Sequence, residues 1–129
     1  MDEHPNVTLY RQVNEKFAQG DIQAFFDVLA DDVVWHEIGG RTLQGKDAVV
    51  DSMSGFEDVE FDIEVHDVVG NDEHVVGLVE ATVGSGDQSF RYRTAEIAHV
   101  KEGKVTERWA FSDDTQRIDD FFSSMGGGT

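Results

Sequence analysis

The chain lacks cysteine, and it has no apolar run that approaches the ~18 residues of a membrane-spanning helix. The absence of cysteine excludes disulfides, thiol nucleophiles and cysteine-ligated metals. The N-terminal residues MDEHPN carry none of the basic and apolar character of an export signal. From these absences we expect a cytoplasmic protein.

Positive charge is also scarce, because 10 Lys and Arg face 27 Asp and Glu, which gives a formal net charge of −17. Such a charge repels nucleic acid and anionic membranes, so we expect neither as a partner. The acids are spread along the chain instead of gathered in one block. This pattern is typical of cytoplasmic proteins from salt-loving microbes, and the plainer alternative is an ordinary acidic, soluble protein.

The length of 129 residues fits one domain. A hydrophobic content of 39%, including nine Phe, two Trp and two Tyr, argues against disorder despite the high charge. No internal repeat or linker divides the chain. We therefore expect a single domain over residues 1–129, with its core at about 6–122 and a disordered, glycine-rich tail at 123–129.

Helices are predicted in the first half of the chain from apolar residues at helical spacing. The first spans about residues 6–19, with Asn6 as its N-cap and Gly20 as its stop. A second helix follows Asp21, and a third spans about residues 46–54. The apolar faces of the first two carry Val7, Tyr10, Val13, Phe17, Ile22, Phe25, Phe26 and Leu29.

Strands are predicted where apolar and polar residues alternate with period two, most clearly after residue 55. A short C-terminal helix is predicted at about 115–122. Three helices followed by a four-stranded meander indicate an α+β domain, with helices against one face of a curved antiparallel sheet. The predicted strands span about residues 33–38, 41–43, 60–66, 74–83, 89–100 and 104–112.

The order of these elements, with the segments GD…LADDVVWHE, GGRTLQGKDAV and EGKVTERWAFSDD, resembles the SnoaL-like branch of the nuclear-transport-factor-2-like superfamily. This branch includes ketosteroid isomerase, limonene epoxide hydrolase and polyketide cyclases, and the likeness runs from about residue 7 to 122. It implies a cone-shaped, cystatin-like α+β roll. A strongly curved antiparallel sheet surrounds a pocket, about three N-terminal helices pack on its concave side, and many members dimerise. Function varies widely on this fold, and some members only bind.

Strand phasing predicts which side chains line the pocket. A three-residue hairpin loop at 101–103 pairs Val100 with Lys104, and so sets Glu96 directly opposite Arg108. The resemblance also places both residues on the concave face, and it implies the same face for Trp35, Glu37 and Glu80. We expect Glu37 and Arg108 as catalytic residues, and the ligand-binding residues Tyr10, Phe17, Trp35, Glu80, Tyr92 and Glu96.

Glu80 fits this lining only under one condition. A two- or four-residue loop at Ser85 and Gly86 turns Glu80 to the face opposite Glu96. Keeping both acids inside requires an odd loop or a bulge, which Gly84 and Gly86 permit.

The other face of the sheet is expected to be apolar as well. Because only one face can form the interior of the cone, we expect a homodimer through the convex face. The alternative exchanges the two faces, with Trp109 and Phe111 inside and Arg108 in solvent. On the registers above, this second face carries Val79, Ala81, Ala95, Ile97, Trp109 and Phe111.

The resemblance places a carboxylate general base at Glu37. Beside Trp35 and further carboxylates, we expect desolvation to raise the pKa of Glu37, as a base that acts near neutral pH requires. The alternative is an exposed acid at a strand end. Arg108 would stabilise developing negative charge and hold Glu96 ionised, either as a plain buried ion pair or as a partner that orients the substrate.

Three departures from the resemblance limit the activity that it implies. The position of the isomerase tyrosine holds Val13, the position of the hydrolase arginine holds Glu80, and that of its last-strand aspartate holds Ala110. We therefore expect neither activity in its known form.

Three function classes stay open. The first is a cofactor-free isomerase, lyase, cyclase or hydrolase acting on a compact, partly apolar, oxygenated molecule. The second is a non-catalytic carrier or ligand-sensing module, and the third is an assembly domain with a packed cone. The five histidines show no paired ligand spacing, so we expect no metal site.

Overall fold

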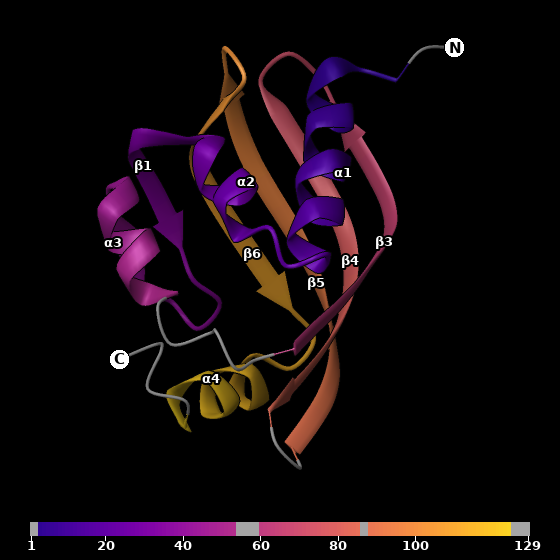
Figure 1. Cartoon of the computed structure of the whole chain (residues 1–129), viewed down its shortest axis with the longest axis vertical. Helices are drawn as coiled ribbons and strands as arrows, with labels where there is room; N and C mark the ends of the chain where they lie inside the picture. Colours follow the sequence, from indigo (N-terminus) through magenta and orange to yellow (C-terminus); the bar gives the residue numbers. More distant parts are fainter. Residues whose placement is uncertain (1–2, 54–59, 86–87, 125–129) are drawn as a thin grey trace.

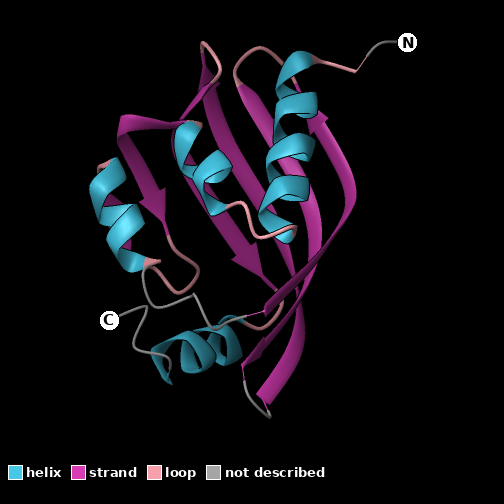
Figure 2. Ribbon diagram, in the orientation of Figure 1, coloured by secondary structure: helices cyan, strands magenta, loops and turns pink. Residues whose placement is uncertain are grey.

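The structure, a computed structural model, describes residues 3–53, 60–85 and 88–124. A six-stranded sheet in the order β2-β1-β6-β5-β4-β3 curls around α1 and α2, and α4 lies at one end of the sheet (Figures 1 and 2). Within these residues, no helix has the length and apolar character needed to cross a membrane. The elements are α1 (Pro5–Ala18), α2 (Ile22–Asp27), β1 (Leu29–His36), β2 (Thr42–Gln44), α3 (Lys46–Ser52), β3 (Glu60–Gly70), β4 (His74–Ser85), β5 (Gln88–Lys101), β6 (Lys104–Ser112) and α4 (Thr115–Ser124).

This architecture confirms the predicted α+β class and the curved sheet with helices on its concave side. The sheet is larger than the predicted four-stranded meander, because β1 and β2 join its edge. β1 pairs in parallel with β6, and Trp35 stands opposite Arg108. β1 thus places Trp35 beside Arg108 on β6.

The boundaries of several elements differ from the predicted ones, and β3 is four residues longer than predicted. His4, not Asn6, caps α1 by accepting a hydrogen bond from the Asn6 N–H at 3.1 Å, and Pro5 takes the first helical position that suits its fixed φ. β1 already begins at Leu29. α4 continues to Ser124, two residues into the predicted tail, whose residues 125–129 lie outside the described part of the chain.

Three apolar clusters hold the helices to the sheet. One packs α1 against β3, β4 and β5, and it contains Val7, Val68, Val75, Ala98 and Val100. A second packs α2 and α3 against β1, and it contains Phe26, Leu29, Val33, Trp35 and Val49. The third packs α4 against the far ends of β4 and β5, and it contains Val83, Phe90, Ile118 and Phe121.

The β5–β6 hairpin has a different register from the predicted one. Lys101 pairs with Lys104 around a two-residue turn, in which Glu102 and Gly103 have φ values of 52° and 77°. Positive φ at both central residues is typical of the turns that match the twist of a hairpin. A bulge between His99 and Val100 then shifts the pairing again, so Glu96 stands opposite Ala110.

The β4–β5 register places Glu80 on the outer, convex face, so the expectation that it lines the pocket is wrong. Ser85 pairs with Gln88, which leaves a two-residue connection, and Glu80 therefore stands opposite Arg93. Its carboxylate pairs with Arg91 and Arg93. The pKa of the Glu80 carboxyl is held below its usual value. The hydrogen bond from Arg91 is the largest cause, and the Arg91 charge and the contacts with Arg93 add to it.

The same register corrects the predicted composition of the outer face. Val79 and Ala81 face the inside of the cone, where both are buried. Apolar residues nevertheless form two rows across the outer face, in which neighbours are paired on adjacent strands. Leu78 is 43% exposed and Phe111 is 60% exposed. The rows are Val69, Val76, Ile97 and Trp109, and Leu78, Ala95 and Phe111.

Gly77 allows α1 to approach the sheet. The ring of Tyr10 lies directly over β4, and a Cβ added at Gly77 would overlap the Tyr10 hydroxyl oxygen. Gly77 stands opposite Glu96 on β5. The missing side chain therefore opens the path by which the phenol reaches a carboxylate on the next strand.

Substituting Gly77 tests this close approach. We expect Gly77→Ala to lower the free energy of unfolding by about 1–3 kcal/mol, because the Tyr10 ring must move away from Glu96. The measurement is chemical denaturation of Gly77→Ala, Tyr10→Leu and the double variant. The cost of Gly77→Ala should shrink in the Tyr10→Leu background, since the two residues are in contact. Additive costs would contradict the proposed role of Gly77.

Candidate functional site

The concave side of the sheet encloses a cavity of about 280 Å³. Its walls come from α1, α2, α4 and five of the strands, and most of the lining side chains are apolar. A largely apolar hollow with a few polar groups is the usual form of a small-molecule site. The polar and charged side chains in its lining are Asn6, Tyr10, Asn14, Glu37, Arg41, Tyr92, Thr94, Glu96, Arg108 and Asp119.

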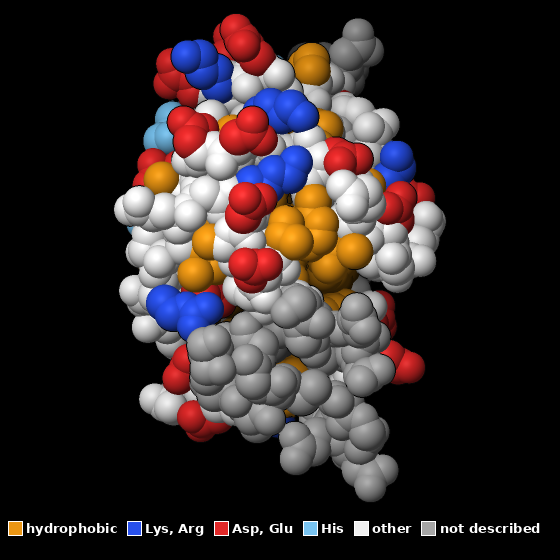
Figure 3. All heavy atoms as spheres, turned by 60° about the vertical axis from the view of Figure 1, so that its left-hand side comes forward, with side chains coloured by type: hydrophobic (Ala, Val, Ile, Leu, Met, Phe, Trp, Pro, Cys, Tyr) orange, Lys and Arg blue, Asp and Glu red, His pale blue; other side chains and the backbone are white. Residues whose placement is uncertain are grey.

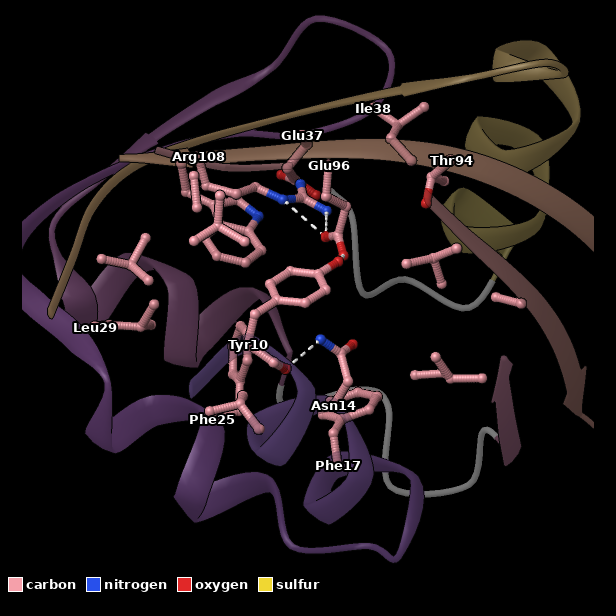
Figure 4. A pocket seen from close by; sticks show the side chains of 18 of the residues that line it. Tyr10, Asn14, Phe17, Phe25, Leu29, Glu37, Ile38, Thr94, Glu96 and Arg108 are labelled. Carbon is pink, nitrogen blue, oxygen red and sulfur yellow. Dashed lines mark hydrogen bonds and ion pairs between the residues drawn. The ribbon is translucent and has the colours of Figure 1, made fainter. Parts of the chain in front are cut away.

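Glu96, Arg108 and Tyr10 form one hydrogen-bonded cluster inside this cavity (Figure 4). Arg108 donates from Nη2 and Nε to Glu96 Oε2, at 2.7 and 3.2 Å. The Tyr10 hydroxyl donates to Glu96 Oε1 at 2.5 Å. Glu96 and Arg108 keep only 20% and 14% of their side-chain surface exposed, so the pair is held in a water-poor place.

The predicted ion pair is therefore present, although the two residues are not directly opposite one another. Ala98 stands opposite Arg108, and the guanidinium reaches Glu96 diagonally on the same face of the sheet. The shift of two positions from the predicted register preserves the face on which Arg108 lies. The alternative with exchanged faces, which puts Arg108 in solvent, is wrong.

The environment of Glu96 keeps it ionised. Burial alone would raise the pKa of the Glu96 carboxyl, but the nearby Arg108 charge and the hydrogen bonds from Tyr10 and Arg108 outweigh burial and lower it. Burial and the Glu96 charge raise the pKa of the Tyr10 phenol far above its ordinary value. Tyr10 therefore acts as a fixed hydrogen-bond donor to Glu96 and keeps its proton.

Arg108 also connects the cluster to the first strand. Its Nη1 donates to the backbone oxygen of His36 at 3.1 Å, and its guanidinium carbon lies 4.3 Å from the centre of the Trp35 ring. His36 directly precedes Glu37 in the chain. The ion pair thus fixes the end of β1, where the predicted general base is attached.

Glu37 lines the cavity just after the end of β1. Its Oε1 atom accepts from Arg41, with both Nε and Nη2 at 2.8 Å. The turn between them is closed by the Glu37 N–H, which donates to the Arg41 backbone oxygen at 2.7 Å. Within the described residues, Oε2 of Glu37 accepts no hydrogen bond, so one carboxylate oxygen is open to a ligand.

The remaining predicted residues lie in the cavity wall, except for Glu80. Phe17, Trp35 and Tyr92 all contribute to the lining. Phe17 and Trp35 both contact Phe25 edge to face, which fixes their rings. Burial, with the Glu96 charge, raises the pKa of Tyr92 to about 12, so its phenol stays protonated.

Five polar lining residues were not predicted to line the cavity: Asn6, Asn14, Arg41, Thr94 and Asp119. A sequence signal existed for two of them. Asn14 follows Tyr10 by one helical turn, and Thr94 lies between Tyr92 and Glu96 with period two. Arg41 and Asp119 come from a turn and from the C-terminal helix, whose positions no periodic pattern fixes.

The described residues contain no group of three or more His, Asp or Glu side chains arranged to hold a metal ion. The cavity carboxylates Glu37 and Glu96 are each paired with an arginine. Arginine-paired carboxylates in an apolar wall favour binding or acid–base chemistry over metal coordination.

The ionisation of Glu96 gives a pH-dependent prediction. Because the folded pKa is lowered, the contribution of Glu96 to stability is complete above its unfolded pKa of about 4.3 and is lost as pH falls through the lower folded value. We expect Glu96→Gln to lower the free energy of unfolding by about 3 kcal/mol at pH 7, because it leaves Arg108 uncompensated.

Denaturation of both proteins between pH 7 and about pH 3 measures this difference. The gap between wild type and Glu96→Gln should be constant above about pH 5 and shrink below about pH 4. Glu73→Gln, an exposed acid with no ion pair to the described residues, is the control and should change little. A gap that stays constant down to the lowest pH would contradict an ionised Glu96.

The comparisons with known proteins agree with this fold. The family model of the SnoaL-like domain matches residues 10–108, and a search of curated proteins found no match. An LEH-like epoxide hydrolase from M. tuberculosis has a similar structure, with a TM-score of 0.73, 18% identity, and coverage of 96% of this chain and 94% of that chain.

Two further solved structures have the same fold. An NTF2-like protein of unknown function from Burkholderia pseudomallei has a TM-score of 0.77 and 20% identity, with 94% of this chain and 99% of that chain covered. Bal32a, from a soil-derived mobile gene cassette, has a TM-score of 0.75 and 19% identity, with 91% and 95% covered. At these identities the similarity shows the fold alone. With its family model matched over most of its length, the chain belongs to the SnoaL-like domain family.

Proposed function

We propose that the chain binds a compact, partly apolar, oxygenated molecule in the cone and converts it without a cofactor, as an isomerase, cyclase or hydrolase that uses Glu37 as its general base. The supporting observation is the Oε2 atom of Glu37, which accepts no hydrogen bond from the described residues and belongs to a side chain in the wall of an apolar cavity. A general base must lie within hydrogen-bond reach of the proton that it removes. Glu37 meets this condition for a ligand in the cavity.

The surroundings of Glu37 suit this role because they fix its position. Arg41 holds Oε1, and the Arg108 contact with the His36 backbone oxygen holds the preceding residue. A carboxylate with one oxygen fixed and the other free can accept a proton from a carbon beside a carbonyl or from a water. Both reactions develop negative charge on an oxygen of the substrate.

Arg108 is the proposed partner for that developing charge. Three of its N–H contacts go to Glu96 and to the His36 backbone oxygen, which leaves further N–H groups for a ligand acceptor. The cost of this arrangement is that the Glu96 carboxylate already neutralises Arg108. The proposed stabilisation is thus that of a positioned hydrogen-bond donor and not that of a free positive charge.

A second candidate is a non-catalytic binding module. One observation favours it: Tyr10, Glu96 and Arg108 satisfy one another without a ligand. In such a module the cluster would orient a bound molecule and leave it unchanged. Among the neighbours in structure, an LEH-like epoxide hydrolase supports the catalytic candidate, while the fold alone supports both.

Substituting the base distinguishes these candidates. We expect Glu37→Gln to lower turnover at least ~100-fold, because the amide cannot accept the proton, with little change in melting temperature. The measurement is turnover and thermal unfolding against a panel of ketones, lactones and epoxides. Glu73→Gln, which changes net charge equally, should keep full activity. Retained turnover in Glu37→Gln rules out the role of Glu37, and a stabilising ligand that stays unchanged chemically favours the binding module.

We also propose that the chain is a cytoplasmic homodimer adapted to high salt and joined through the outer face of its sheet. Exposed Leu78 and Phe111, within the two apolar rows, support a partner on this face. Acidic side chains are spread over the surface seen in Figure 3. Their mutual repulsion opposes assembly until salt screens it.

Light scattering tests this assembly. We expect a dimer in molar KCl and a shift toward monomer at low salt. Phe111→Glu should give a monomer even in high salt, because it buries a charge at the interface. Ala18→Glu adds the same charge at the exposed end of α1, and it should leave the dimer intact. A wild type that is monomeric at every salt concentration contradicts the proposed interface.

A further inference from the structure

We propose that the cavity binds a protonated amine carried on an apolar skeleton, in preference to the matched alcohol and against the matched carboxylate. This inference rests on the proposal that the cavity is the ligand site, and it does not depend on catalysis. It names the charge of the ligand, which the function proposed above leaves open.

The first reason is that both arginines in the cavity wall are already neutralised. Arg108 Nη2 lies 2.7 Å from Glu96 Oε2, and Arg41 Nη2 lies 2.8 Å from Glu37 Oε1. A ligand carboxylate or phosphate could gain a full ion pair only by taking an arginine from its partner. The displaced glutamate would then face the apolar cavity without compensation, which is unfavourable.

The second reason is an excess of negative charge in the lining. Asp119 on α4 is a third carboxylate in the cavity wall, and it forms no ion pair with the described residues. The described lining therefore carries one more negative than positive charge. Asp119 is exposed, so water weakens its field, and the excess favours a cation over an anion only modestly.

The third reason is the number of aromatic rings around the cavity. The faces of aromatic rings attract cations, most strongly where water is excluded. Arg108 shows this interaction within the protein, since its guanidinium lies over the Trp35 ring. In Figure 4 the labelled Phe17 and Phe25 lie on the same side of the cavity as Tyr10, beside the helices. The aromatic lining residues are Tyr10, Phe17, Phe25, Trp35, Phe61 and Tyr92.

The fourth reason is the presence of hydrogen-bond acceptors that lack a donor among the described residues. Glu37 Oε2 and the side-chain oxygen of Asn14 have no donor among the described residues, while Asn14 Nδ2 is used by the Tyr10 backbone oxygen at 2.9 Å. An ammonium group only donates hydrogen bonds, whereas a carboxylate only accepts them. These two acceptors match an amine, and the N–H groups that Arg108 keeps are left for an oxygen of the same ligand.

Binding of three matched probes tests the inference. The probes are cyclohexylmethylamine, cyclohexylmethanol and cyclohexanecarboxylate, which share a ring and differ in charge at pH 7. Isothermal titration in 0.5 M KCl screens the field of the whole acidic chain. We expect the amine to bind at least ~10-fold tighter than the carboxylate and about threefold tighter than the alcohol.

Two variants separate the cavity from the general charge of the protein. Asp119→Asn should weaken the amine about threefold and leave the alcohol unchanged. Glu73→Gln removes the same charge from an exposed site outside the cavity lining, and it should change neither affinity. Phe17→Leu should reduce the ratio of amine to alcohol affinity, because it removes a ring face but keeps an apolar side chain.

The ratio is the decisive readout, since damage to the fold would weaken both probes together. Equal or tighter binding of the carboxylate overturns the inference, as does a loss of amine affinity in Glu73→Gln that equals the loss in Asp119→Asn. Failure of all three probes to bind at up to about 10 mM overturns it as well. These outcomes do not depend on turnover, so an inactive protein that selects the amine refutes catalysis and leaves this inference standing.

Discussion

The ion pair between Glu96 and Arg108 is the interaction on which the interior of this protein depends. Two charges in an apolar cone are tolerable only when each is compensated and hydrogen-bonded. Here the compensation comes from four separate elements: Glu96 on β5, Arg108 on β6, Tyr10 on α1 and the His36 backbone oxygen on β1. The contacts that compensate this buried pair therefore join α1 to β1, β5 and β6.

This constraint explains features that would otherwise look unrelated. Tyr10 reaches Glu96 only because Gly77, opposite Glu96, has no side chain. The Arg108 guanidinium lies over the Trp35 ring because the parallel pairing of β1 with β6 sets these two residues side by side. Glu37, two residues after Trp35, is then carried to the rim of the same cavity. The ion pair thus gathers Tyr10, Glu96 and Arg108 into one cluster within the cavity wall.

The side of the sheet on which a strand residue lies could be predicted only as well as the register between neighbouring strands. Alternation identified the strands, and Glu96 and Arg108 were correctly assigned to the inner face. That success depended on two compensating features: the turn is one residue shorter than predicted, and the bulge after His99 restores the phase. Either alone would have turned Arg108 outward. Glu80 shows the opposite case. Two residues connect β4 to β5, and the described pairing of these strands has no register shift, so Glu80 lies on the face opposite Glu96.

Side chains from turns and from helix ends could not be predicted in the same way, because their positions depend on packing between distant segments. Arg41 reaches Glu37 through a turn containing two glycines with positive φ, and Asp119 approaches Gly39 only once α4 has packed. These two residues determine how much of the charge on Glu37 is cancelled and how much negative charge is left over. The sheet therefore fixes where the site lies, whereas the loops and the last helix fix its net charge. A relative with the same sheet but a different turn at Arg41 could bind a ligand of opposite charge.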